Sequence, residues 1–128
     1  MPEPSSFEYA IVRVVPYVER EEFLNVGVIL YCRAQRYLDA HIELDRERLA
    51  ALSPRLDLEM VEAELALIPR ICAGGRDAGP IGKLDQAERF RWRTSPRSSS
   101  IQISAVHCGL CVDPGAELIS IMEGMLCR

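Results

Sequence analysis

The chain has 128 residues, of which 48% are hydrophobic and 27% are charged, a composition typical of one globular domain and unlike that of a disordered chain. Its formal net charge of −4 argues against attraction of the whole protein to nucleic acid, although it allows a local basic patch. No apolar run approaches the ~20 residues that cross a bilayer, and the first residues lack the pattern of a signal peptide. We therefore expect one cytoplasmic domain over residues 1–128 that does not enter a membrane.

Two short runs of apolar and β-branched residues, 7–15 and 26–32, predict the central strands of a sheet. Gly27 lies inside the second run, where a glycine often marks a bulge or the close approach of another backbone. Residues 37–44 alternate between apolar and polar side chains, and His41 belongs to the polar set. This alternation predicts a strand with one buried and one exposed face.

Helices are predicted in the middle and at the end of the chain. A short helix is expected over residues 46–52, and a longer one follows Asp57 with apolar residues repeating at three and four positions. Pro69 removes a backbone donor, so this helix is expected to kink or to end there. The last helix is expected to begin at Asp113-Pro114, with aspartate as the N-cap and proline in the first helical position.

The segment after Gln86 alternates arginine with aromatic residues. An extended conformation would place three arginines on one face, whereas a helix would scatter them; we favour a strand over residues 89–93, followed by another over 101–106. Such a strand, with Trp92 nearby, suits RNA, single-stranded DNA, a nucleotide or an acidic partner helix. Alternatively, the arginines neutralise acidic residues of this chain or of a second copy. The residues of this candidate surface are Arg89, Arg91, Arg93, Arg97 and Ser98.

A C-x-x-C pair, Cys108 and Cys111, follows His107 in a predicted turn. Thiolates at this spacing can hold one metal ion, but a zinc site needs two further ligands and no second C-x-x-C is present. The pair could also be a redox dithiol, or simply two semi-buried thiols in a turn. The five cysteines are an odd number, which argues against a disulfide framework. No cofactor is expected.

A hydrolytic site is a further possibility, because His41, His107, Ser98 and Asp113 supply suitable residue types. The chain contains no G-x-S-x-G, H-E-x-x-H or P-loop motif. Each residue also has a simpler role as a strand, turn or capping residue. Whether the protein is an enzyme is left open.

Five motifs occur in order: Y-x-x-V-R-x-x-P from Tyr9, E-F-L-N-V-G-V-I-L over 22–30, R-F-x-W from Arg89, P-R-S from Pro96 and H-x-G-L-x-x-D-P from His107. Together they resemble the bacterial "domain of unknown function 3037" family. The resemblance extends over nearly the whole chain, and N-V-G-V-I-L is its most specific block.

The resemblance implies no established activity. Family members are often encoded beside a kinase-like protein that resembles the HipA toxin kinase, which implies an accessory or partner role. The matched polar positions are Asn25, Arg97, Ser98, His107 and Asp113, whereas Cys108 and Cys111 fall at positions that vary in the family pattern. The resemblance thus favours a shared polar surface over a metal or dithiol site.

The predicted fold is α+β: a single domain with a mainly antiparallel sheet of four or five strands and two or three helices packed on one face. The predicted function is a non-enzymatic interaction or accessory module, with a HipA-like kinase as the suggested partner and with a homodimer possible. The alternatives are nucleic-acid or nucleotide binding through the arginine-rich strand, and a metal or thiol site at His107-Cys108-x-x-Cys111. The sequence leaves open whether the arginine and histidine motifs lie together.

Overall fold

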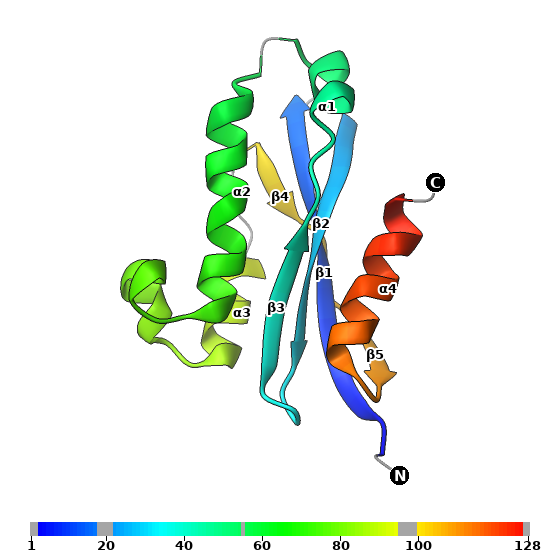
Figure 1. The fold of residues 1–128 in the computed structure, drawn as a ribbon, viewed down its shortest axis with the longest axis vertical. Coiled ribbons are helices and arrows are strands. Elements are labelled where there is room, and N and C mark those ends of the chain that lie inside the picture. Colours follow the sequence, from blue (N-terminus) through cyan, green and yellow to red (C-terminus); the bar gives the residue numbers. More distant parts are fainter. Residues whose placement is uncertain (1–2, 18–21, 55, 95–99, 127–128) are drawn as a thin grey trace.

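An antiparallel sheet of five strands forms the centre of the fold (Figure 1). The computed structural model describes residues 3–17, 22–54, 56–94 and 100–126. The order in the sheet is β3-β2-β1-β4, and β5 pairs with β1 beside β4. The strands are β1 (Ser5–Tyr17), β2 (Glu22–Cys32), β3 (Tyr37–Ile42), β4 (Ile101–Ile103) and β5 (His107–Cys111). The prediction that the first two runs are central strands is therefore confirmed, since β1 and β2 each have neighbours on both sides.

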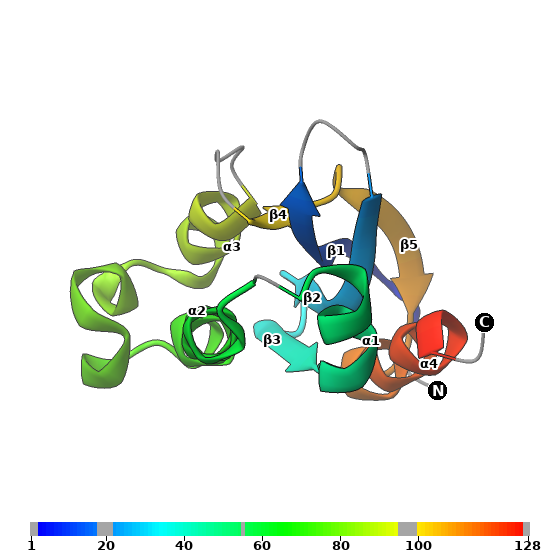
Figure 2. The same cartoon turned by 90° about the horizontal axis from the view of Figure 1, so that it is seen from above.

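Helices cover both faces of this sheet (Figure 2). One buried cluster joins β1, β2 and β3 to α1, α2 and α3, and a second joins β1, β2 and β5 to α4. The predicted α+β class and mainly antiparallel sheet are confirmed. The prediction placed two or three helices on one face of the sheet. In the structure, α4 packs on the face opposite to α2, because β2 carries apolar side chains on both of its faces. The helices are α1 (Arg46–Leu52), α2 (Leu58–Ala73), a 3-10 helix (Arg76–Lys83), α3 (Gln86–Thr94) and α4 (Pro114–Leu126).

The ends of the helices follow the sequence signals closely. Asp57 Oδ1 accepts a hydrogen bond from the backbone of Met60, and Asp113 Oδ1 accepts two from the first turn of α4. The alternative in which the helix ends at Pro69 is wrong, because α2 continues past it to Ala73. Ile71 and Cys72 beyond the proline are buried, and their burial offsets the backbone hydrogen bond that proline cannot make. None of the helices in the described ranges is long and apolar enough to cross a membrane.

A bulge in β2 changes which side chains face α4. Val12 pairs with Gly27, but the next residue of β1, Arg13, pairs with Asn25. Val26 is therefore an extra residue, and it is fully buried in the cluster with α2. Since a bulge reverses the faces of the residues beyond it, Asn25 shares the α4 side of the sheet with Arg13. Without the bulge, this amide would point toward the core beneath α2.

Two predictions for the segment after residue 100 are corrected by the structure. The predicted strand over residues 101–106 ends at Ile103, where the chain leaves β4 and begins β5 at His107. Ser104 bridges the gap: its Oγ accepts from the backbone of Ile11 at 2.8 Å, and its own N–H donates to Ile11 at 2.9 Å. The predicted turn at His107 is instead an edge strand, which pairs residue for residue with the first part of β1.

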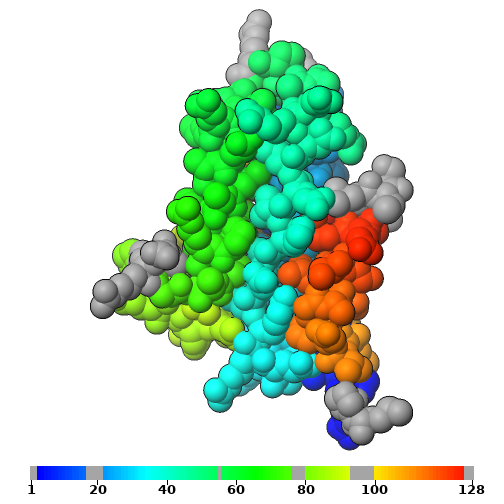
Figure 3. Space-filling model, viewed as in Figure 1, coloured from blue at the N-terminus to red at the C-terminus, as the bar shows by residue number. Residues whose placement is uncertain are grey.

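In Figure 3, the other edge of the sheet, β3, lies uncovered between α2 and α4.

Candidate functional site

The predicted arginine-bearing strand is an α-helix, so that interpretation is wrong. Asp85 Oδ1 accepts from the backbone of Glu88 at 2.8 Å and caps the start of α3, and Phe90 is buried in the cluster beneath it. Arginines two residues apart on a helix do not share a face. Arg91 is exposed, whereas Arg89 is only 8% exposed. Arg93 belongs to the same helix, and Arg97 and Ser98 lie outside the described residues.

Arg89 has a structural environment. Its guanidinium lies against Gly74 so closely that a Cβ on this glycine would collide with it. Gly74 also has a positive φ of 75°, which favours glycine. The buried Nε of Arg89 has no hydrogen-bond partner within the part of the chain that the structure describes. Arg89 therefore covers the turn after α2 and is removed from the candidate binding surface.

The C-x-x-C pair does not form a shared site. Residues three apart on a strand point to opposite faces, and here Cys108 is exposed while Cys111 is buried against α4. Burial raises the pKa of Cys111, and the neighbouring thiol of Cys32 raises it further. Across the described ranges, no three His, Cys, Asp or Glu side chains are arranged to hold a metal ion. The metal and dithiol alternatives therefore find no support in this geometry.

The residues of the hydrolytic alternative are also dispersed. His41 lies on β3 and His107 on β5, and the strands β2 and β1 lie between them. At the usual spacing of strands, β3 and β5 are about 14 Å apart. His41 lies 3.5 Å from a carboxylate oxygen of Glu43, and Asp113 caps α4. Ser98 is outside the described residues. No pair of these described residues forms a nucleophile and its base.

Three strands instead bring Tyr9, Asn25 and His107 together around one pocket of about 330 Å³. Tyr9 and His107 are direct partners across β1 and β5, with ring centroids 5.2 Å apart. Asn25 reaches the same side of the sheet because of the bulge at Val26. The remaining lining is mainly apolar and comes from β1 and the last turns of α4: Ile11, Ile121, Gly124 and Met125.

The side chain of Arg13 lies beside this pocket. Arg13 pairs with Asn25 across the sheet, so the two side chains are neighbours on one face. The guanidinium carbon of Arg13 lies 4.5 Å from the ring centroid of Phe23, which is itself exposed. The Nε atom of Arg13 is buried and has no hydrogen-bond partner among the described residues. We call Tyr9, Asn25 and His107 the polar pocket, and Arg13 with Phe23 its rim.

Comparison with known proteins identifies the family. The model of the family described as "Protein of unknown function (DUF3037)" matches residues 9–126. The chain belongs to the DUF3037 family. Searches of curated proteins and of solved structures found no match.

The motifs that carry the DUF3037 resemblance include Tyr9, Arg13, Asn25 and His107, and all four meet at the polar pocket and its rim. Sequence reasoning selected His107 and noted Asn25 as a motif position, but it did not place them together. The available signal was Gly27, which was interpreted as a sign of a bulge or of a close backbone approach; the structure shows the bulge beside it and also the backbone oxygen of His41 close to it. This signal could not show which way the bulge would turn Asn25.

The outer side of β5 forms a second feature of this DUF3037 domain. Among the described strands, β5 pairs only with β1, so its other edge is free. Cys108 and Leu110 pair with Glu8 and Ser6 and point away from α4. Leu110 is 70% exposed, and Val106 and Val112, which flank the strand, are also exposed. We call Val106, Leu110 and Val112 the apolar stripe.

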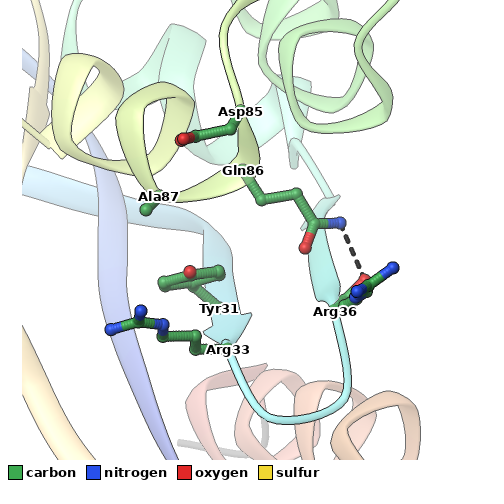
Figure 4. A pocket seen from close by; sticks show the side chains of 6 residues that line it. All are labelled: Tyr31, Arg33, Arg36, Asp85, Gln86 and Ala87. Atoms are coloured by element: carbon green, nitrogen blue, oxygen red, sulfur yellow. Dashed lines mark hydrogen bonds between the residues drawn. The ribbon is translucent and has the colours of Figure 1, made fainter.

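A larger hollow of about 570 Å³ lies between the β2–β3 hairpin and the start of α3 (Figure 4). Gln86 Nε2 donates to the backbone oxygen of Arg36 at 2.8 Å and fixes the hairpin there. The side chains of Arg33 and Arg36 lie on different sides of the hollow in Figure 4 and do not converge. Asp85 adds a charge of opposite sign. This hollow in the DUF3037 domain is therefore a weaker candidate than the polar pocket.

Proposed function

We propose that this domain is an accessory protein-interaction module that binds an extended segment of its partner at the free edge of β5. The observation that carries the proposal is the combination of an unpaired strand edge with exposed apolar residues along it. An edge strand presents unpaired N–H and C=O groups that can pair with another chain. Adding a strand in this way is a recurring mode of peptide recognition.

The chemistry of β5 favours such a partner. Edge strands are usually protected by lysine, proline or inward-pointing charges, and His107–Cys111 contains neither a proline nor a Lys, Arg, Asp or Glu residue. The apolar stripe would remain in water without a partner. The matching segment is therefore extended, uncharged opposite β5, and apolar at the alternate positions that face the stripe.

The edge is also held in place before binding. Five consecutive residues of β5 pair with β1. The ring of Phe7 packs over Gly109, and Cys111 is buried in the cluster with α4. A preformed strand loses little conformational entropy when a partner adds to it. A free edge of five residues suits a small and reversible interface.

A HipA-like kinase is the partner that we propose, because the family resemblance implies one. The strand first predicted to make this contact is the helix α3, in which Arg89 is buried, so we place the proposed contact at β5 instead. The alternative occupant of this edge is a second copy of the domain. If the β5 strands of two copies paired antiparallel with Gly109 at the centre, Cys108 of one copy would lie opposite Leu110 of the other. Nucleic acid is disfavoured by the net charge of −4.

The test compares two exposed apolar residues in binding to a HipA-like kinase from the same genome, measured by calorimetry with purified proteins. Leu110→Asp should weaken binding at least about tenfold, because it places a charge in the stripe. Ile119→Asp, on the exposed side of α4, should leave the affinity unchanged. Equal affinity of wild type and Leu110→Asp would refute the proposal. A concentration-dependent dimer that Leu110→Asp abolishes would assign the edge to a second copy.

A further inference from the structure

We propose that the polar pocket binds a nucleotide whose base carries an exocyclic amine, with the phosphate held at Arg13. This inference goes beyond the interaction proposed for β5 and uses a different surface. His107 points toward α4, whereas Leu110 on the same strand points away from it. A ligand in the polar pocket and a partner on the apolar stripe would therefore contact opposite sides of β5.

The lining of the pocket fits one aromatic base. The rings of Tyr9 and His107 lie 5.2 Å apart with 31° between their planes. Tyr9 is half-buried and His107 is exposed, and an aromatic ring with one open face can stack on a base. Ile11, Ile121 and Met125 add apolar walls. A volume of about 330 Å³ is at the small end of ligand pockets, so it suits a single base better than a dinucleotide.

The end of α4 favours a ligand that donates hydrogen bonds inside the pocket. Gly124 and Met125, in the last turn of α4, line the pocket. The last carbonyls of a helix lack intrahelical partners and form the negative end of its dipole. This last turn contains no basic residue. The pocket therefore disfavours an anion and favours N–H groups such as an exocyclic amine.

Asn25 adds recognition of the base edge. Its amide carries both a donor and an acceptor, the combination that pairs with the amine and ring nitrogen of adenine. Asn25 reaches this position through the bulge at Val26. Uracil can also pair with this amide, through its N3–H and O4, but it has no exocyclic amine to donate to the last carbonyls of α4. The pocket should consequently prefer adenosine monophosphate (AMP) to uridine monophosphate (UMP).

The rim supplies the charge that the pocket lacks. Arg13 is the strand neighbour of Asn25, and its guanidinium is supported by the ring of Phe23 at 4.5 Å. Its Nε atom is buried, so a phosphate would have to meet the terminal nitrogens of the guanidinium. Guanidinium groups bind phosphate through charge-assisted hydrogen bonds. A base in the pocket would thus place its phosphate outside, toward Arg13.

The experiment titrates AMP, adenosine and UMP into the whole protein and follows binding by calorimetry and by amide NMR shifts. His107→Ala should weaken AMP binding about tenfold or more, because one stacking face is lost. His41→Ala, which removes the other histidine of the chain from β3, should have no effect. Arg13→Met should weaken AMP but not adenosine, while Arg33→Met, at an exposed arginine of the hairpin, should change neither.

The outcomes separate this inference from the proposed function. No binding of AMP or adenosine at millimolar concentration overturns it, as does AMP binding that survives both His107→Ala and Asn25→Ala. Equal affinities for AMP and UMP also overturn it. Amide NMR spectra of each variant establish whether it is folded. Leu110→Asp should leave AMP binding intact, so failure of the interface at β5 would not be mistaken for failure of the pocket.

Discussion

Tyr9 and His107 face each other across β1 and β5, with their ring centroids 5.2 Å apart. The pairing joins a residue from the start of the chain to one near its end. It exists because β5 adds to the first part of β1, below the point where β4 pairs with the same strand edge. The polar pocket and the free edge of β5 both depend on this arrangement.

Gly27→Ala should destabilise the fold. A Cβ at this position would lie 2.5 Å from Cδ1 of Ile42 and 2.7 Å from the backbone oxygen of His41. The backbone oxygen cannot move without disturbing the pairing of β2 with β3, so we expect a loss of about 1–3 kcal/mol in the free energy of unfolding. Urea denaturation measures the change. Gly124→Ala is the matched control, because its Cβ meets nothing within 4 Å in α4 and should stabilise the protein by up to about 1 kcal/mol.

Ser104→Ala should cost about 1–3 kcal/mol of stability, because it leaves the backbone N–H of Ile11 without its acceptor. Ser104 is buried, and its Oγ accepts that hydrogen bond at 2.8 Å. Thermal and urea unfolding both report the loss. The exposed Ser120 in α4 offers a comparison, since Ser120→Ala should stay within about 0.5 kcal/mol of wild type. Equal stability of the two variants would show that Ser104 does not hold β4 and β5 together.

Arg89→Ala should destabilise the protein by about 1–3 kcal/mol through lost packing over Gly74. Arg33→Ala removes an exposed arginine from the hairpin and should have an effect within about 0.5 kcal/mol. Chemical denaturation of both variants provides the comparison. A stable Arg89→Ala protein would return this residue to the list of candidate binding residues.

The described cysteines should differ in reactivity. In a Cys127→Ser background, Cys108 should react with a thiol reagent in the native protein, because it is exposed. The buried Cys32, Cys72 and Cys111 should react only after urea is added. Counting thiols before and after unfolding tests this directly. Fast native labelling of Cys111 would contradict its position in the cluster with α4.

Stability should fall at alkaline pH. Burial raises the pKa of Cys111 above that of the unfolded chain, and the nearby thiol of Cys32 adds to the effect. The folded state therefore holds this proton more tightly. The contribution to stability is complete below the unfolded pKa and is lost as the pH rises toward and through the folded pKa. Urea denaturation at pH 7 and at pH 10 measures the free energy of unfolding. This free energy should decrease less between the two pH values for Cys111→Val than for wild type.

Much of the fold is readable from local patterns. The apolar runs of β1 and β2 and the alternation of β3 predict strands because burial on one or both faces imposes those patterns. The aspartates before α1, α2 and α4 mark their starts because each carboxylate accepts from the first turn. These signals involve residues a few positions apart, so they need no knowledge of the rest of the chain.

Local sequence patterns predicted less of the candidate site than of the fold. The alternation around Arg89 is compatible with a strand, but the cap at Asp85 and the burial of Phe90 produce a helix. Residues 107–111 contain a glycine and two cysteines, a composition that indicates a turn as readily as a strand. Their extended conformation comes from five pairings with β1, which no local pattern contains.

The sequence alone therefore determined the class of fold, the central strands and the ends of most helices, because these depend on local periodicity and capping. Only the tertiary structure decided that α4 covers the opposite face from α2 and that Asn25 meets Tyr9 and His107. The physical reason is that strand pairing and the direction of a bulge are set by hydrogen bonds and burial between distant segments. Neither segment carries that information by itself.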